Sequence, residues 1–108
     1  MKELVEMSKA LDESADMRHR WKSLKIDWHP EYPFNARKKL KLRRRILDEI
    51  KNRLESGKRD ENEIADEVCQ SLIGTIFITA VIQAIIKVMA KRLVEWWEKR
   101  RKPGGYDD

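Results

Sequence analysis

The chain of 108 residues is poor in cysteine, glycine and proline, and each shortage excludes a class of protein. A single cysteine, Cys69, cannot form an internal disulfide, so nothing requires an oxidising compartment. Four glycines and three prolines, with 41% apolar residues and no low-complexity run, are unlike the composition of a disordered chain. We expect one folded domain over residues 1–108, in a reduced cell interior.

Recognisable catalytic and metal-binding patterns are also missing. There is no serine or cysteine with a plausible base, no glycine-rich phosphate loop and no carboxylate pair on an apolar face. His19 and His29 match no structural zinc spacing. The acidic surroundings of Cys69 raise a thiol pKa, which predicts a packed and inert cysteine. We therefore expect no enzyme activity, no metal and no cofactor.

Charge is abundant but segregated along the chain. The net charge of +5 comes from a sequence that is 40% charged. Residues 37–59 hold eleven Lys or Arg against three acids, residues 61–71 hold four acids and no base, and residues 87–102 hold seven bases against two acids. Such segregation concerns partners more than fold.

Apolar spacing and helix-end signals predict an all-α fold of three helices. The first helix is expected over about 2–25, followed by a proline and aromatic loop over 26–35. A basic helix over about 36–56 is expected to begin at Asn35 as N-cap and to end at Gly57. Its apolar face is formed by Leu40, Ile46, Leu47, Ile50 and Leu54.

The third expected helix is long and mostly apolar. Asp60 followed by Glu63 resembles a capping box, and no proline interrupts the chain before Pro103. A helix over about 61–101 would be roughly 60 Å long, with Gly74 as its one weak point. A short polar tail over 102–108 follows.

The segment LIGTIFITAVIQAIIKVMA, residues 72–90, is apolar nearly all round when it is drawn as a helix. Its neighbouring and internal polar residues form a thin line spaced by four: Ser71, Thr75, Thr79, Gln83 and Lys87. Two shorter helices cover only one side of such a rod, so lipid or another subunit must cover the rest.

Two interpretations of this segment stay open. A membrane span is favoured by a length near 20 residues and by tryptophans beside a basic flank, although Gln83 and Lys87 oppose insertion. Packing within an oligomer or larger assembly is favoured by the small residues Ala80 and Ala84, which allow close helix approach. The candidate oligomer interface comprises Ile73, Ile76, Phe77, Ala80, Ala84, Trp96 and Trp97.

The stretch ARKKLKLRRR, residues 36–45, places cations at the start of a helix, where the helix dipole disfavours them. Spacing by four predicts pairs of Arg44 with Asp48 and of Arg45 with Glu49. The other five cations of the stretch have no acid at that spacing. The candidate binding residues are Arg37, Lys38, Lys41, Arg44 and Arg45.

This basic helix has two interpretations. In the functional one, it contacts nucleic acid through phosphates without reading bases. In the structural one, it is a solvated face or a face that meets the acidic block of a neighbouring subunit. The loop aromatics Trp28, Tyr32 and Phe34 are either a plug over the helix ends or a docking arm for a neighbour.

Together these patterns predict a non-enzymatic structural or adaptor protein of a nucleic-acid-containing assembly, such as a virion component. It would be intracellular or within a nucleoprotein particle, and it would self-associate through the apolar helix. The alternative is a small single-span membrane protein with residues 72–90 in the bilayer and basic flanks at anionic lipid.

Overall fold

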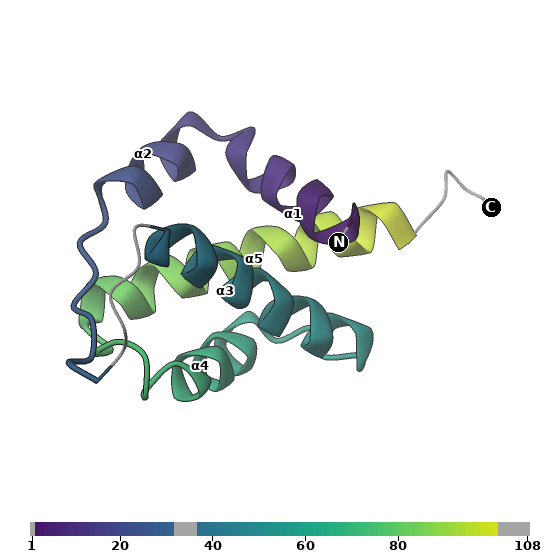
Figure 1. Ribbon diagram of the computed structural model, residues 1–108. Coiled ribbons are helices and arrows are strands. Elements are labelled where there is room, and N and C mark those ends of the chain that lie inside the picture. The colour runs from purple at the N-terminus through teal and green to yellow at the C-terminus, as the bar shows by residue number, and fades with distance from the viewer. Residues whose placement is uncertain (1, 32–36, 102–108) are drawn as a thin grey trace.

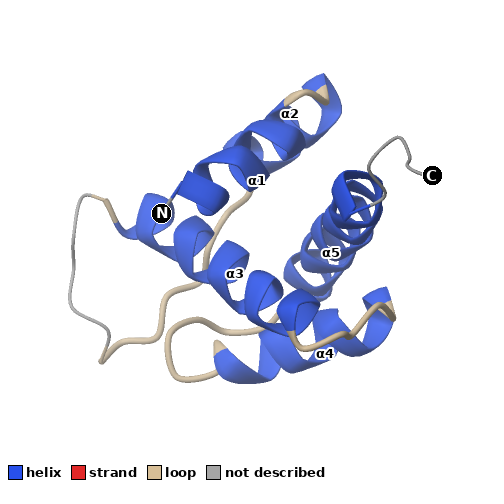
Figure 2. Cartoon of the chain, turned by 90° about the vertical axis from the view of Figure 1, so that its right-hand side faces the viewer, coloured by secondary structure: helices blue, strands red, loops and turns tan. Residues whose placement is uncertain are grey.

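Five helices form the computed structural model, which describes residues 2–31 and 37–101 (Figure 1). They are α1 (Lys2–Asp12), α2 (Ala15–Ser23), α3 (Lys38–Glu55), α4 (Glu61–Ser71) and α5 (Ala80–Arg101). The predicted all-α class is therefore confirmed, but the described part of the chain contains five helices where three were expected. The end view shows α1 above α3, α4 below α3, and α5 beside them (Figure 2).

The predicted helix over 2–25 is interrupted at Ser14. This residue has an extended backbone, and its hydroxyl accepts a hydrogen bond from the Met17 N–H at 3.2 Å. A serine that satisfies an N–H three residues ahead is an N-cap, so a new helix begins there. The apolar spacing carries across the break, because Leu11 and Met17 are both buried.

The basic helix α3 ends as the sequence predicts. Gly57 has a φ of +99°, its N–H donates to the Leu54 carbonyl, and the Lys58 N–H donates to the Arg53 carbonyl. These two bonds are a Schellman motif, which needs a left-handed residue. The expected N-cap Asn35 lies outside the described residues.

The start of α4 is also as predicted. The Asp60 carboxylate accepts hydrogen bonds from the N–H groups of Asn62 at 2.9 Å and Glu63 at 3.4 Å. Five residues thus separate α3 from α4, and α4 returns along α3 (Figure 1).

The predicted single helix over 61–101 is wrong, because residues 72–79 leave helical geometry. The segment pairs briefly with the loop after α2: the His29 N–H donates to the Thr75 carbonyl at 2.9 Å, and the Phe77 N–H donates to the Asp27 carbonyl at 2.8 Å. This pairing satisfies backbone groups that a continuous helix would use internally. Gly74, the expected weak point, lies inside the interruption.

A second N-cap restarts the helix. The Thr79 hydroxyl accepts a hydrogen bond from the Ile82 N–H at 3.2 Å, and the Thr79 carbonyl accepts one from the Gln83 N–H at 3.0 Å. The supposed polar line therefore has several roles: Thr79 caps, Thr75 is buried, and only Gln83 and Lys87 lie exposed on α5.

The interruption lets the chain shield much of its own apolar segment. α5 folds back along α4, and Ile76, Ile86 and Met89 are at most 1% exposed. The expectation of one continuous apolar rod is therefore wrong, and outside cover of the face that stays exposed remains a prediction. Among residues 2–31 and 37–101, no helix combines the length and the apolar character that a membrane crossing requires.

The two ends of the helical region are tied together. Arg100 on α5 forms ion pairs with Glu3 and Glu6 on α1, and its guanidinium lies 4.8 Å from the Trp96 ring centre. Trp97 is buried in the core. The basic end of α5 therefore packs against α1.

Candidate nucleic-acid interface

The N-terminal half of the basic helix, residues 37–45, carries seven cations and no acid. Because α3 begins here with no acidic residue in its first turn and with no side-chain hydrogen bond from Arg37 as cap, these charges oppose the helix dipole. What each cation contacts decides whether it stabilises the fold or is left for a partner.

Lys39 is used internally. Its ammonium donates to the carbonyls of Lys22 at 3.1 Å and Leu24 at 2.9 Å, which end α2, and it lies 5.6 Å from the Trp21 ring centre. A cation at the C-terminal end of a helix is favourable. Its desolvation lowers the pKa of the Lys39 amine below its ordinary value.

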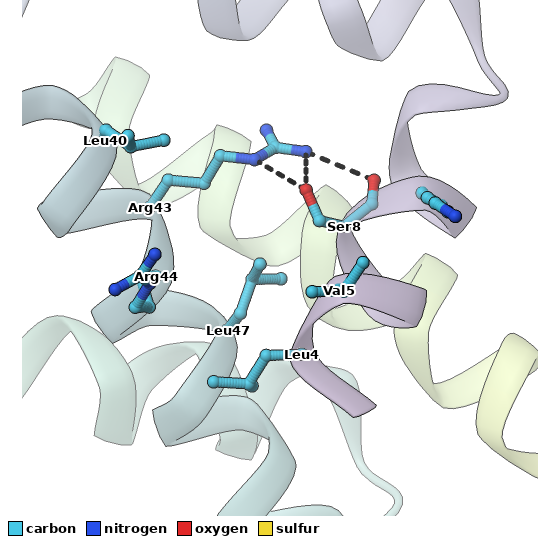
Figure 3. Close-up of a pocket in the computed structure, with 8 residues that line it drawn as sticks. Leu4, Val5, Ser8, Leu40, Arg43, Arg44 and Leu47 are labelled. Atoms are coloured by element: carbon cyan, nitrogen blue, oxygen red, sulfur yellow. Dashed lines mark hydrogen bonds between the residues drawn. The ribbon is translucent and has the colours of Figure 1, made fainter. Parts of the chain in front are cut away.

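Arg43 is also used internally and is only 8% exposed. Its guanidinium pairs with the Asp12 carboxylate at 2.9 Å and donates to the Ser8 hydroxyl at 3.3 Å, so it joins α3 to the end of α1 (Figure 3 shows the Ser8 contacts). The Trp21 ring lies 5.5 Å from the guanidinium carbon. This arginine is satisfied within the chain.

Arg45 holds the interrupted segment. It donates to the Ser71 carbonyl at the end of α4 and, at 2.9 Å, to the Thr75 hydroxyl. The predicted pair of Arg45 with Glu49 is wrong, because Glu49 pairs with Arg53 at 2.7 Å. As a candidate binding residue, Arg45 is therefore partly occupied by the fold.

Three cations of this half are exposed on one face: Arg37, Lys41 and Arg44 are separated by four and three residues. Lys41 and Arg44 make no ion pair with a described residue, and the predicted pair of Arg44 with Asp48 does not form. Lys38 lies partly buried, with its ammonium 5.0 Å from the Trp28 ring centre.

Two further lysines extend this surface, and the sequence pattern did not identify them. The bonds from Lys39 to the end of α2 bring Lys22 and Lys25 beside the start of α3. Both side chains are exposed, and neither pairs with an acid in the described chain. We call Lys22, Lys25, Arg37, Lys41 and Arg44 the cationic surface. Only the tertiary contact through Lys39 joins its two parts.

The remaining basic residues of α3 and its following turn are neutralised by acids. Arg53 pairs with Glu49 at 2.7 Å and Glu67 at 2.8 Å, and Lys58 pairs with Glu67 and Glu63. Hydrogen bonds from Lys58 and then Arg53 lower the pKa of the Glu67 carboxyl. The acidic residues of α4 therefore neutralise the cations at the end of α3 and not those at its beginning.

The candidate oligomer interface divides into buried and exposed residues. Ile76 and Trp97 belong to the chain's own core, and Trp96 is partly buried. Ile73, Phe77, Ala80 and Ala84 are exposed, and the neighbouring Val81 is 62% exposed. Ala80, Val81 and Ala84 also line a groove of about 720 Å³ against Ser23, Leu24 and Lys25 at the end of α2. We call Ile73, Phe77, Ala80, Val81 and Ala84 the apolar face.

The aromatic loop is described only in part. Trp28 packs against the core and takes part in the backbone bridge with Ile76. His29 stacks on Phe77 with 5.3 Å between ring centres. Tyr32 and Phe34 lie outside the described residues, so the choice between plug and docking arm for them stays a prediction.

Metal and thiol chemistry find little support in the described chain. No group of three His, Cys, Asp or Glu side chains in residues 2–31 and 37–101 is placed to hold a metal ion. Cys69 is buried, and desolvation, with Asp66 adding to it, raises the pKa of its thiol.

Basic side chains on a helix surface can contact phosphates electrostatically, and they provide no base readout by themselves.

Comparisons of this chain with known protein families, with curated proteins and with solved structures found no match.

Proposed function

We propose that this protein is a non-enzymatic structural or adaptor component of a nucleic-acid-containing assembly, and that its cationic surface contacts phosphates. One observation carries the proposal: Lys41 and Arg44 are exposed and pair with no acid among residues 2–31 and 37–101, on a helix half with seven cations and no acid. Cations at a helix start reduce stability, so a role in binding gives a reason for their presence.

The geometry of the three exposed α3 cations suits a phosphate strand. Arg37, Lys41 and Arg44 span seven residues, which is about 10 Å of helix. Phosphates of one strand follow one another by about 3.4 Å of duplex axis, so this row covers about three of them. Lys22 and Lys25 would add contacts on one flank. Such binding depends on salt and little on base sequence.

A salt titration of polynucleotide binding tests this proposal. We expect the wild-type chain to bind duplex and single-stranded polynucleotide at low ionic strength. The double variant K41E/R44E should bind more weakly. The negative slope of log affinity against log salt should become shallower by about two, because two phosphate contacts are lost.

The matched control reverses two exposed cations of α5, in K87E/K91E, with the same change in net charge. This control should bind more tightly than K41E/R44E. Equal loss in both variants would reduce the effect to net charge, and no wild-type binding at low salt would end the proposal.

We also propose that the chain self-associates through the apolar face. Three of the five exposed large hydrophobic residues of the described chain belong to this face, and small alanines beside a groove allow close approach of a neighbour. Assemblies of this kind occur in compact virion or nucleoprotein particles.

Sedimentation measures the self-association directly. The variant F77S/V81S should shift the chain to a smaller species, whereas L40S, which removes an exposed hydrophobic side chain elsewhere, should not. A wild-type chain that stays monomeric with and without polynucleotide would exclude self-association.

A further inference from the structure

A second surface, between α1 and α3, is not used by the functions proposed above. Leu4, Val5, Ser8 and Lys9 of α1 and Leu40, Arg43, Arg44 and Leu47 of α3 line a groove of about 220 Å³. Figure 3 shows the α3 residues on one wall and Leu4, Val5 and Ser8 on the other. The other two exposed large hydrophobic residues of the described chain, Val5 and Leu40, belong to these two walls.

Leu40 contradicts its expected place in the core. It is 56% exposed, whereas the other four residues of its predicted apolar face are buried. Val5 is 51% exposed on the opposite wall, and the buried Leu47 lies beneath. The described residues leave this apolar opening uncovered, and exposed apolar surface rimmed by polar groups marks interaction sites in proteins.

The walls of the groove are held in place. Arg43 of α3 donates hydrogen bonds to Ser8 and Asp12 of α1, so the two walls are joined; Figure 3 shows the bonds to Ser8. A preformed site loses little conformational freedom when a partner binds.

The charges beside the groove select the partner. Lys9 lies on the α1 wall and Arg44 on the α3 wall, and neither pairs with an acid in the described residues. A segment bound in the groove would therefore have one cation without an acid partner among the described residues on each side, Lys9 or Arg44. This arrangement attracts acidic flanks and disfavours basic ones.

The size and lining decide between classes of occupant. Small-molecule sites usually hold about 300–1,000 Å³, so this groove is small for a whole ligand. An apolar cavity of about 150 Å³ holds a benzene ring, which makes this groove suited to one or two apolar side chains. No aromatic residue among those described lines it, so the described walls offer no platform for stacking a base.

We propose that the groove between α1 and α3 binds an acidic amphipathic helix of a partner protein. Apolar residues of that helix, spaced by three or four, insert between Val5 and Leu40, and acidic residues beside them pair with Lys9 and Arg44. This is recognition of a helix in a groove. It goes beyond the proposed phosphate contact, with which it shares only Arg44.

A displayed library of helical peptides of about 15 residues, selected on the full chain, tests the proposal. We expect enrichment of peptides with apolar residues at helical spacing and with acidic flanks. The best peptide is then measured by fluorescence anisotropy. L40S should weaken its binding about tenfold or more, as expected for loss of a central apolar contact, and R44E should weaken it as well.

The control K87E reverses an exposed cation of α5 outside both proposed surfaces, as a match for R44E, and should bind the peptide like wild type. L40S should also keep its affinity for polynucleotide, which separates this site from the cationic surface. The unfolding midpoint of each variant verifies the fold. Failure to enrich peptides, enrichment without acidic residues, or equal binding to L40S would each overturn the proposal.

Discussion

The two halves of α3 carry similar basic residues but use them differently. In the C-terminal half with its following turn, residues 46–59, the cations pair with carboxylates of α1, α3, α4 and α5. In the N-terminal half, residues 37–45, three cations bond within the fold, and Lys41 and Arg44 form no ion pair with any described residue. The same residue type thus stabilises the fold in one place and is left available for binding in another.

The difference follows from where the acids lie. Glu67 and Glu63 on α4 stand beside the end of α3, because α4 begins there and returns along it. Near the start of α3, the bonds described for Lys39 reach carbonyl oxygens and those of Arg43 reach the carboxylate of Asp12. The positive charges of this half are therefore stabilised only where a hydrogen bond or ion pair from another element reaches them.

The largest expected effect separates two adjacent arginines of the N-terminal half. R43A should reduce the free energy of unfolding by about 2–3 kcal/mol, because several hydrogen bonds of a buried guanidinium are lost. R44A should change it by less than about 0.5 kcal/mol, because Arg44 is exposed and unpaired. Urea denaturation measures both, and similar losses would contradict the division between used and available cations.

The next effect concerns the turn that ends the C-terminal half. G57A should cost about 1–2 kcal/mol, because Gly57 holds a left-handed φ of +99° while it places Lys58 near Glu67. G74A is the control, since Gly74 has no positive φ and an added Cβ would contact nothing within 4 Å. It should be neutral or stabilise by about 0.4–1 kcal/mol, as measured by thermal unfolding. A destabilising G74A would show that the interruption needs glycine.

Smaller effects of opposite sign are expected from one substitution made in each half. K41E should stabilise the fold by about 0.3–1 kcal/mol, because it replaces an unpaired cation near a helix start by an acid. K51E should destabilise it by about 0.5 kcal/mol, because Lys51 pairs with Glu55 at 3.2 Å and lies near Glu3. Two changes of the same sign in urea denaturation would contradict the comparison of the halves.

The smallest expected effect is a difference in acid sensitivity. The pKa of Glu67 is lowered from its ordinary value of 4.5, chiefly by its hydrogen bond with Lys58. Its contribution to stability is therefore present above pH 4.5 and is lost as the pH falls through the lower folded pKa. E67Q should remove this part of the acid dependence. A set of urea titrations from neutral to acidic pH measures it, and an unchanged pH slope in E67Q would exclude the pairing.

The comparison also limits how far the candidate site could be predicted. The concentration of cations in residues 37–45 is visible in the sequence, and the candidates Lys41 and Arg44 within it are exposed in the structure. The contacts of Lys39, Arg43 and Arg45 within the fold could not be predicted from the sequence. Their partners lie at the end of α2, on α1 and in the segment after α4, respectively. Spacing by four gave the wrong pairs for Arg44 and Arg45. Arg45 bonds to Ser71 and Thr75 while Glu49 pairs with Arg53, and nothing in the structure explains why Arg44 and Asp48 stay unpaired.

Sequence alone determined the all-helical class, the start of α4 at Asp60 and the end of α3 at Gly57. These features depend on bonds between residues two to five positions apart, which a local pattern contains. The tertiary structure alone decided that residues 72–79 leave the helix and that Leu40 is uncovered. Backbone bonds from Asp27 and His29 reach that segment from a distant part of the chain, and no local pattern reports such a contact.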